Sequence, residues 1–86
     1  MESDNKKLLI KKLLYRSIHR GCKETDILLG NFAIARTESF DDLKLKLYQD
    51  FITEDDMEIY DWLLRAKIAP EKYQNLVIEI QQFHNL

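Results

Sequence analysis

The sequence contains few of the residues that interrupt regular structure or cross-link a chain. Its 86 residues include two glycines, one proline and one cysteine. So little glycine and proline argues against a turn-rich β fold. A single cysteine excludes a disulfide within the chain and is typical of proteins from a reducing compartment.

Long apolar runs and a recognisable targeting segment are also missing from the sequence. No apolar run approaches the roughly 18 residues that a membrane-spanning helix requires, so we expect no membrane insertion. Residues 1–5 read Met-Glu-Ser-Asp-Asn, which is polar and acidic. Secretory signals begin with basic residues followed by an apolar stretch, and organellar transit peptides are rich in arginine. The N-terminal composition therefore predicts a cytoplasmic protein.

Charge is unevenly distributed along the chain. Residues 1–23 carry seven Lys or Arg and two Asp or Glu, so this segment has a net charge of +5, whereas the remainder has −7. A basic helix on an acidic body could steer the protein toward an acidic partner or a phosphate. Alternatively, the lysines only solvate the outer face of the helix, and the sequence does not decide between these interpretations.

Apolar residues recur at helical spacing along most of the chain, and the length is that of one domain covering residues 1–86. Helices are predicted over residues 5–20 and 23–36, and further helices should begin near residues 39, 53 and 70. The predicted fold class is therefore all-α, a compact bundle of about five short helices.

The segment from Leu43 to Leu47 alternates leucine with lysine, which is the pattern of a strand. We nevertheless predict a helix there. Leu43, Leu47 and Phe51 also form a helical stripe, and both leucine and lysine favour helices. No partner strand is visible elsewhere in the sequence.

Other local signals define helix ends and contacts. Ser3 or Asp4 is expected to cap the first helix, and residues 53–56 (Thr-x-x-Asp) read as a capping box, with Ile52 and Met57 as a hydrophobic staple. Gly30 inside the second helix predicts a close contact between helices. The indole of Trp62 should lie in the core.

The corner between the first two helices has the sequence Arg20-Gly21-Cys22-Lys23-Glu24. A glycine at this place lets a helix end through a residue with positive φ. Arg20 and Glu24 suit the negative and positive helix ends that meet there. The segment is either a well-built turn or a recognition tip that presents Arg20 and Glu24, a few ångströms apart, at the surface.

The sequence contains few residues in an arrangement that would indicate catalysis or metal binding. His19, Cys22 and His84 are the only soft ligands, and no zinc-binding spacing relates them. His19 and Cys22 could form a base and nucleophile, but no third member is apparent. A glycine-rich phosphate loop is missing, and the second helix is not basic enough to read DNA. We therefore expect no metal, no nucleic acid and no enzymatic activity, and favour a binding or assembly role.

Three segments of the chain resemble the FAD assembly factors of succinate dehydrogenase, the flavinator family of small five-helix proteins. Residues 20–24 look like the family's Arg-Gly-x-x-Glu motif. Residues 26–32 (Asp-Ile-Leu-Leu-Gly-Asn-Phe) continue it in the family manner, and residues 54–64 resemble the acidic and then aromatic fourth helix. The resemblance covers nearly the whole chain.

The resemblance implies a chaperone-like protein that binds the flavoprotein subunit of succinate dehydrogenase and promotes covalent attachment of FAD to a histidine of that subunit. A fumarate reductase is a second candidate client. FAD would be inserted into the partner and not held stably by this chain. The expected protein is a monomer from the bacterial cytoplasm. The alternative is a generic helical interaction or regulatory domain without a flavoprotein client.

The resemblance also implies which residues face the partner. Arg20, Gly21 and Glu24 are the motif positions, and His19 and Asp26 lie beside them. Family members often carry an arginine where this chain has His19, and a methionine where it has Cys22. The charge of His19 depends on pH, so the basic rim of the motif could be weaker in this chain.

Overall fold

The computed structural model describes the backbone of residues 2–86 and the side chains from Asp4 onward. Its elements are, in chain order, α1 (Glu2–Ile18), α2 (Lys23–Arg36), the 3₁₀ helix η1 (Thr37–Ser39), α3 (Asp42–Phe51), α4 (Asp56–Leu63), the 3₁₀ helix η2 (Glu71–Tyr73) and α5 (Gln74–Phe83). No strand occurs within residues 2–86, and the predicted all-α fold with five α-helices is confirmed.

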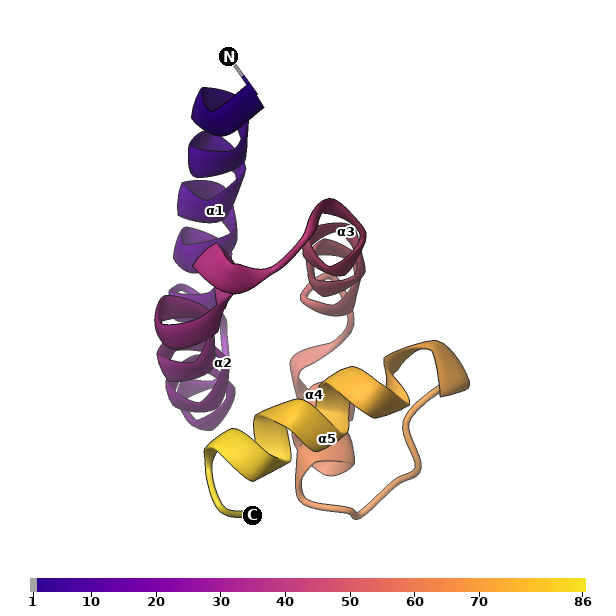
Figure 1. Cartoon of the computed structure of the whole chain (residues 1–86). Coiled ribbons are helices and arrows are strands. Elements are labelled where there is room, and N and C mark those ends of the chain that lie inside the picture. The colour runs from indigo at the N-terminus through magenta and orange to yellow at the C-terminus, as the bar shows by residue number, and fades with distance from the viewer. Residues whose placement is uncertain (1) are drawn as a thin grey trace.

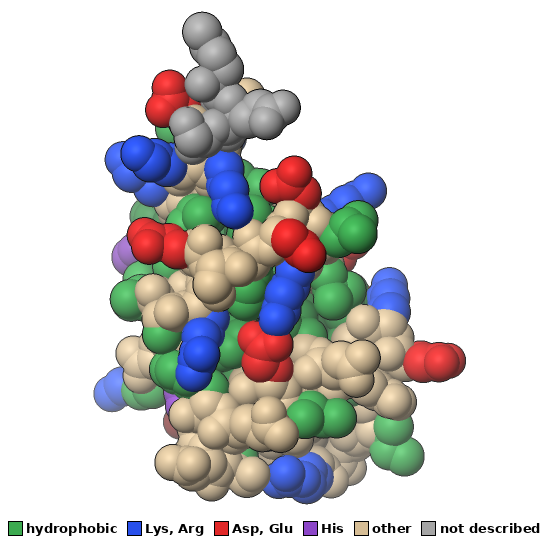
Figure 2. Space-filling model, viewed as in Figure 1, with side chains coloured by type: hydrophobic (Ala, Val, Ile, Leu, Met, Phe, Trp, Pro, Cys, Tyr) green, Lys and Arg blue, Asp and Glu red, His purple; other side chains and the backbone are tan. Residues whose placement is uncertain are grey.

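The helices form an elongated bundle with extents of 42 × 24 × 22 Å. In Figure 1, α1 and α2 form a hairpin along one side, α3 lies across from α1, and α4 and α5 close the lower end. The short helix α4 packs against both α2 and α5. A groove of about 560 Å³ separates α1 from α3, and hydrophobic side chains show on this face in Figure 2.

Aromatic side chains dominate the core. Their rings pack in a continuous series with neighbouring centroids 5.2–6.4 Å apart, and the series contains Phe32, Phe40, Tyr48, Phe51, Trp62 and Tyr73. Such pairs stabilise a fold beyond the apolar area that they bury. The indole of Trp62 is 6% exposed, which confirms its predicted place in the core.

A buried polar contact joins α1 to α3 inside this core. The hydroxyl groups of Ser17 and Tyr48 lie 2.6 Å apart, and the Ser17 hydroxyl also donates to the Leu13 carbonyl. Burial raises the pKa of the Tyr48 phenol to about 12. The pair satisfies two hydroxyl groups that would otherwise be buried without partners.

The first helix differs from its predicted range at both ends. It begins at Glu2, so the cap predicted at Ser3 or Asp4 is wrong because both residues lie inside the helix. It ends at Ile18 and not at Arg20, since the backbone N–H of Arg20 donates to the Asp26 carboxylate, 2.6 Å away, and leaves the helical pattern.

The second helix covers Lys23–Arg36, as predicted. Gly30 packs directly on α1, and a Cβ atom added there would lie 3.2 Å from Ile18 Cγ1. The prediction of a close helix contact at this glycine is therefore confirmed.

The third helix is confirmed as a helix, but its start and its buried face differ from the prediction. It begins at Asp42 because Asp41 caps it, accepting a hydrogen bond from the Lys44 N–H at 2.8 Å. Leu43 is 81% exposed, so the predicted stripe is wrong at this residue, whereas its other members, Leu47 and Phe51, do pack on the core. The buried residues of α3 are Leu45, Tyr48 and Phe51.

The cap of α4 is Asp55 and not Thr53, so the predicted capping box is wrong. The Asp55 carboxylate accepts from the Met57 N–H at 3.0 Å, while the Thr53 hydroxyl donates to the Asp50 carbonyl at the end of α3. Met57 is mostly exposed, so it forms no staple. At the other end of α4, the buried Gln81 amide donates to the Leu63 carbonyl at 3.1 Å.

Candidate functional site

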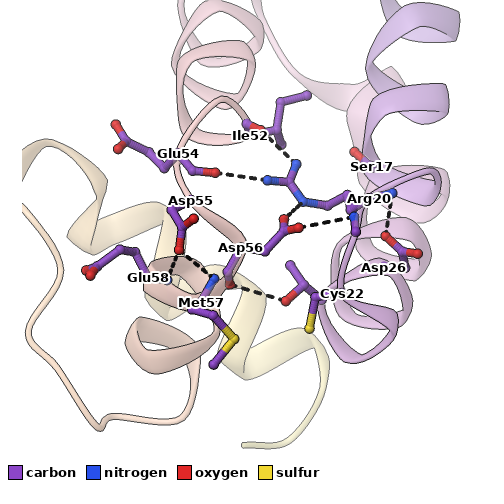
Figure 3. Close-up of polar contacts among 12 residues, drawn as sticks. Ser17, Arg20, Cys22, Asp26, Ile52, Glu54, Asp55, Asp56, Met57 and Glu58 are labelled. Carbon is purple, nitrogen blue, oxygen red and sulfur yellow. Dashed lines mark hydrogen bonds and ion pairs between the residues drawn. The ribbon is translucent and has the colours of Figure 1, made fainter.

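Arg20 lies in the corner between α1 and α2, and its side chain turns inward (Figure 3). Nη1 donates to the Ile52 carbonyl at 2.7 Å and Nη2 to the Glu54 carbonyl at 3.0 Å, while Nε forms an ion pair with Asp56. Only 8% of the arginine side chain is exposed. The alternative in which Arg20 stands at the surface beside Glu24 is therefore wrong, because the carbonyls left free where α3 ends attract the guanidinium inward.

Asp56 binds two residues of the corner, one with each of its carboxylate oxygens. One oxygen pairs with Arg20, and the other accepts a hydrogen bond from the Gly21 N–H at 3.2 Å. The Thr25 hydroxyl of α2 donates to the Asp56 carbonyl at 3.3 Å. The start of α4 therefore determines where the corner lies.

Gly21 does not adopt the left-handed conformation that the sequence suggests. No described glycine has a positive φ, so the turn imposes no backbone requirement for glycine. A Cβ atom at Gly21 would lie 3.5 Å from the nearest Asp56 oxygen, which is ordinary contact. Neither the backbone nor the packing within this chain requires a glycine at this position.

Asp26 is half-buried and serves the corner itself. Its carboxylate accepts the hydrogen bond from the Arg20 backbone N–H at 2.6 Å, which closes the turn between the two helices. Together with the Asp56 pair, this contact holds Arg20 by its backbone and by its side chain.

The exposed residues at the corner are His19, Gly21, Lys23 and Glu24. The pKa of the Glu24 carboxyl is lowered, first by a hydrogen bond from its own backbone N–H and then by the Cys22 thiol, which donates at 3.4 Å. Glu24 is therefore ionised at neutral pH. The His19 ring packs on the Tyr15 ring of α1, with centroids 4.1 Å apart.

A pocket of about 310 Å³ lies beside the corner, between α1 and the loop that joins α3 to α4. It is lined by Tyr15, Arg16, His19, Arg20, Ile52, Thr53 and Asp56. The sequence analysis missed the contributions of Ile52, Thr53 and Asp56. No signal in the sequence links these positions to Arg20, since Asp56 reads simply as an acid at a helix start.

Neither a metal-binding cluster nor a membrane-spanning helix is found among the described residues. Within the described residues, no three His, Cys, Asp or Glu side chains converge as a metal ion would require. Likewise, none of the described helices combines the length and apolar character needed to cross a bilayer.

Comparison with known proteins decides the family. A family model described as "Flavinator of succinate dehydrogenase" matches residues 11–84, from the middle of α1 to the end of α5. The chain belongs to this flavinator family. The predicted resemblance to this family is thereby confirmed, and the matched region includes the whole corner.

Curated relatives carry a consistent description. "Succinate dehydrogenase assembly factor 2, mitochondrial" of Dictyostelium discoideum is 36% identical over 76 residues, covering 88% of this chain and 54% of the relative. The protein of the same description from Aedes aegypti is 34% identical over 87 residues, covering 96% and 54%. That of Schizosaccharomyces pombe is 34% identical over 67 residues, covering 78% and 48%.

The chain spans about half the length of the curated relatives that it matches. These relatives are described as mitochondrial and come from eukaryotes, so the predicted bacterial cytoplasm is wrong. That prediction rested on the composition of five N-terminal residues, which says little about the compartment when relatives are about twice as long.

Proposed function

We propose that this chain is an assembly factor that binds the flavoprotein subunit of succinate dehydrogenase and promotes covalent attachment of FAD to it. The observation that supports this proposal most directly is the family match over residues 11–84. In the proposed role the chain acts as a chaperone. It holds the subunit in the conformation in which the bond to FAD forms, and FAD stays with the subunit.

The proposed partner-binding residues fall into two groups with different tasks. His19, Gly21 and Glu24 are exposed and contact the partner. Arg20 and Asp26 act indirectly, because their hydrogen-bonding groups are engaged within the chain and fix the shape of the corner.

Gly21 supports this assignment because nothing within the chain requires it. A glycine that neither the backbone conformation nor the packing of its own chain requires is suited to a place where the backbone of another molecule approaches closely. The ionised Glu24, in the first turn of α2, adds a fixed negative charge beside that place.

The test is in-gel flavin fluorescence of the denatured flavoprotein subunit, produced with and without this chain. Fluorescence should rise with the wild type and fail to rise with Gly21→Arg. Gly21→Ala is the matched control for the fold, because its Cβ atom meets only ordinary contact. Circular dichroism should show both variants folded.

Two results would contradict the proposal. Equal fluorescence with and without wild-type chain, given a competent subunit, would remove the assembly role. Full flavin attachment with a folded Gly21→Arg variant would keep the assembly role and remove the corner from the contact. A parallel experiment with the flavoprotein subunit of a fumarate reductase tests the second candidate client.

A further inference from the structure

We infer that the pocket beside the corner is a second part of the partner-binding surface, and that it accepts an acidic segment of the partner protein. The inference rests on the proposed function and extends it. It gives a task to the C-terminal half of α1, whose charge the motif does not explain. The pocket shares Arg20 and Asp56 with the corner, so a protein seated on Gly21 also covers the pocket.

The wall of the pocket that α1 supplies has the composition of a protein-binding surface. Tyr15 is 65% exposed, and no other aromatic side chain among the described residues is as open to solvent. Its ring already packs against the His19 ring, tilted by 36°, so little freedom is lost when a partner covers it. Tyrosine and arginine are enriched among the residues that contribute most to protein interfaces.

The charge of the pocket is positive. Arg20 and Asp56 neutralise each other in their ion pair, which leaves Arg16 as the permanent charge on the lining. Lys12 lies one helical turn before Arg16 on the same face of α1, and both side chains are exposed. Neither makes an ion pair with any described carboxylate.

The polar groups on the opposite wall are already engaged, which narrows the choice of ligand. The Thr53 hydroxyl donates to the Asp50 carbonyl at 2.6 Å, and the Ile52 carbonyl accepts from Arg20. The Tyr15 hydroxyl, Arg16 and His19 are therefore the side-chain groups available to a polar ligand. All three suit a carboxylate, because Arg16 is a cation and Tyr15 and His19 can each donate a hydrogen bond.

The inference is tested by calorimetric titration of the wild-type chain and its variants into the purified flavoprotein subunit, at 50 and 200 mM salt. Arg16→Glu should weaken binding at least tenfold and reduce its dependence on salt. Tyr15→Ala should weaken binding about tenfold and leave the salt dependence unchanged. Lys72→Glu is the matched charge reversal, because Lys72 lies on η2, which contributes nothing to the pocket. This control should bind within twofold of the wild type.

The outcomes separate the inference from the proposed function. No binding by the wild type would refute the proposed function itself. Wild-type binding with unchanged affinity in both Tyr15→Ala and Arg16→Glu would overturn the inference alone. Should Arg16→Glu fold poorly, the milder Arg16→Gln takes its place with the same expectations. Anionic vesicles that bind the wild type but not Arg16→Glu, while subunit affinity is unchanged, would assign this face to lipid and overturn the inference.

A cross-link identifies the segment that occupies the pocket. A photoreactive phenylalanine analogue at position 15 should attach to a segment of the subunit that contains Asp or Glu. The same analogue at position 72 should not attach there. Attachment at position 15 to a segment without acidic residues would overturn the inference.

Discussion

The ion pair between Arg20 and Asp56 gives the sharpest prediction for the fold. Asp56→Asn keeps the shape of the side chain and removes the charge that pairs with the guanidinium. Only 8% of the Arg20 side chain and 24% of the Asp56 side chain are exposed, so solvent screens the pair weakly. A hydrogen bond to a charged group contributes about 1.5–3 kcal/mol. Loss of the charge at the start of α4 adds about 0.3–1 kcal/mol.

The expected loss in free energy of unfolding is therefore about 2–4 kcal/mol. Asp55→Asn is the matched control, because it removes a neighbouring charge from the same helix end while asparagine still caps. We expect this control to lose less than about 1 kcal/mol. In a domain of this size each kcal/mol lowers Tm by roughly 4–8 °C.

Urea denaturation followed by circular dichroism measures both variants. The reasoning would be refuted if Asp56→Asn lost no more stability than Asp55→Asn. The pair would then contribute nothing to holding the corner. Flavin attachment offers a second readout, since Asp56→Asn should also lower it by releasing the corner, whereas Asp55→Asn should not.

Three further variants probe the core and the exposed corner. Trp62→Ala should cost roughly 3–5 kcal/mol, because the indole is buried among aromatic rings. Tyr48→Phe should cost about 1 kcal/mol through loss of the hydrogen bond to Ser17. It should also reduce the loss of stability at alkaline pH. The pKa of Tyr48 is raised from 10.0 to about 12, so stability present below pH 10 falls as the pH rises toward 12. Glu24→Ala should cost only about 0.3–1 kcal/mol of stability, as expected for an exposed acid in the first turn of a helix, and should weaken flavin attachment.

Each expectation has a contrary result. A small loss in Trp62→Ala would place the indole at the surface. If the wild type and Tyr48→Phe lost the same free energy of unfolding between pH 10 and 12, the pKa of the Tyr48 phenol would not be raised by folding. Glu24→Ala that supports full flavin attachment would remove Glu24 from the contact.

The helical fold could be predicted because its signal is local. Apolar spacing and the scarcity of glycine and proline were enough to predict five α-helices and both ends of α2. The buried face of α3 could not be predicted, because alternating leucine and lysine residues place leucines on two different rows along the helix. Leu43 is exposed and Leu45 is buried, so the buried face of α3 lies between the two rows and includes Phe51. Packing against distant residues determines which face is buried.

The place of the candidate site could also be predicted, but its internal geometry could not. Residues 20–24 indicated the corner, and residues 26–32 and 54–64 supported the resemblance to the family motif. The direction of the Arg20 side chain depends on the Ile52 and Glu54 carbonyls and on Asp56, which lie 32 to 36 residues further along the chain. Every residue has a backbone carbonyl, whatever its side chain. A sequence pattern therefore cannot show which carbonyls bind an arginine.

The attachments at the two ends of α4 have a consequence for its dynamics. A helix of eight residues is too short to persist alone in water. It depends on Asp56 binding the corner at one end and on Gln81 at the other. The amide hydrogens of α4 should therefore exchange with solvent only when the whole domain opens. A partner that binds the corner would change that exchange rate, so α4 would report binding at a surface to which it contributes Asp56.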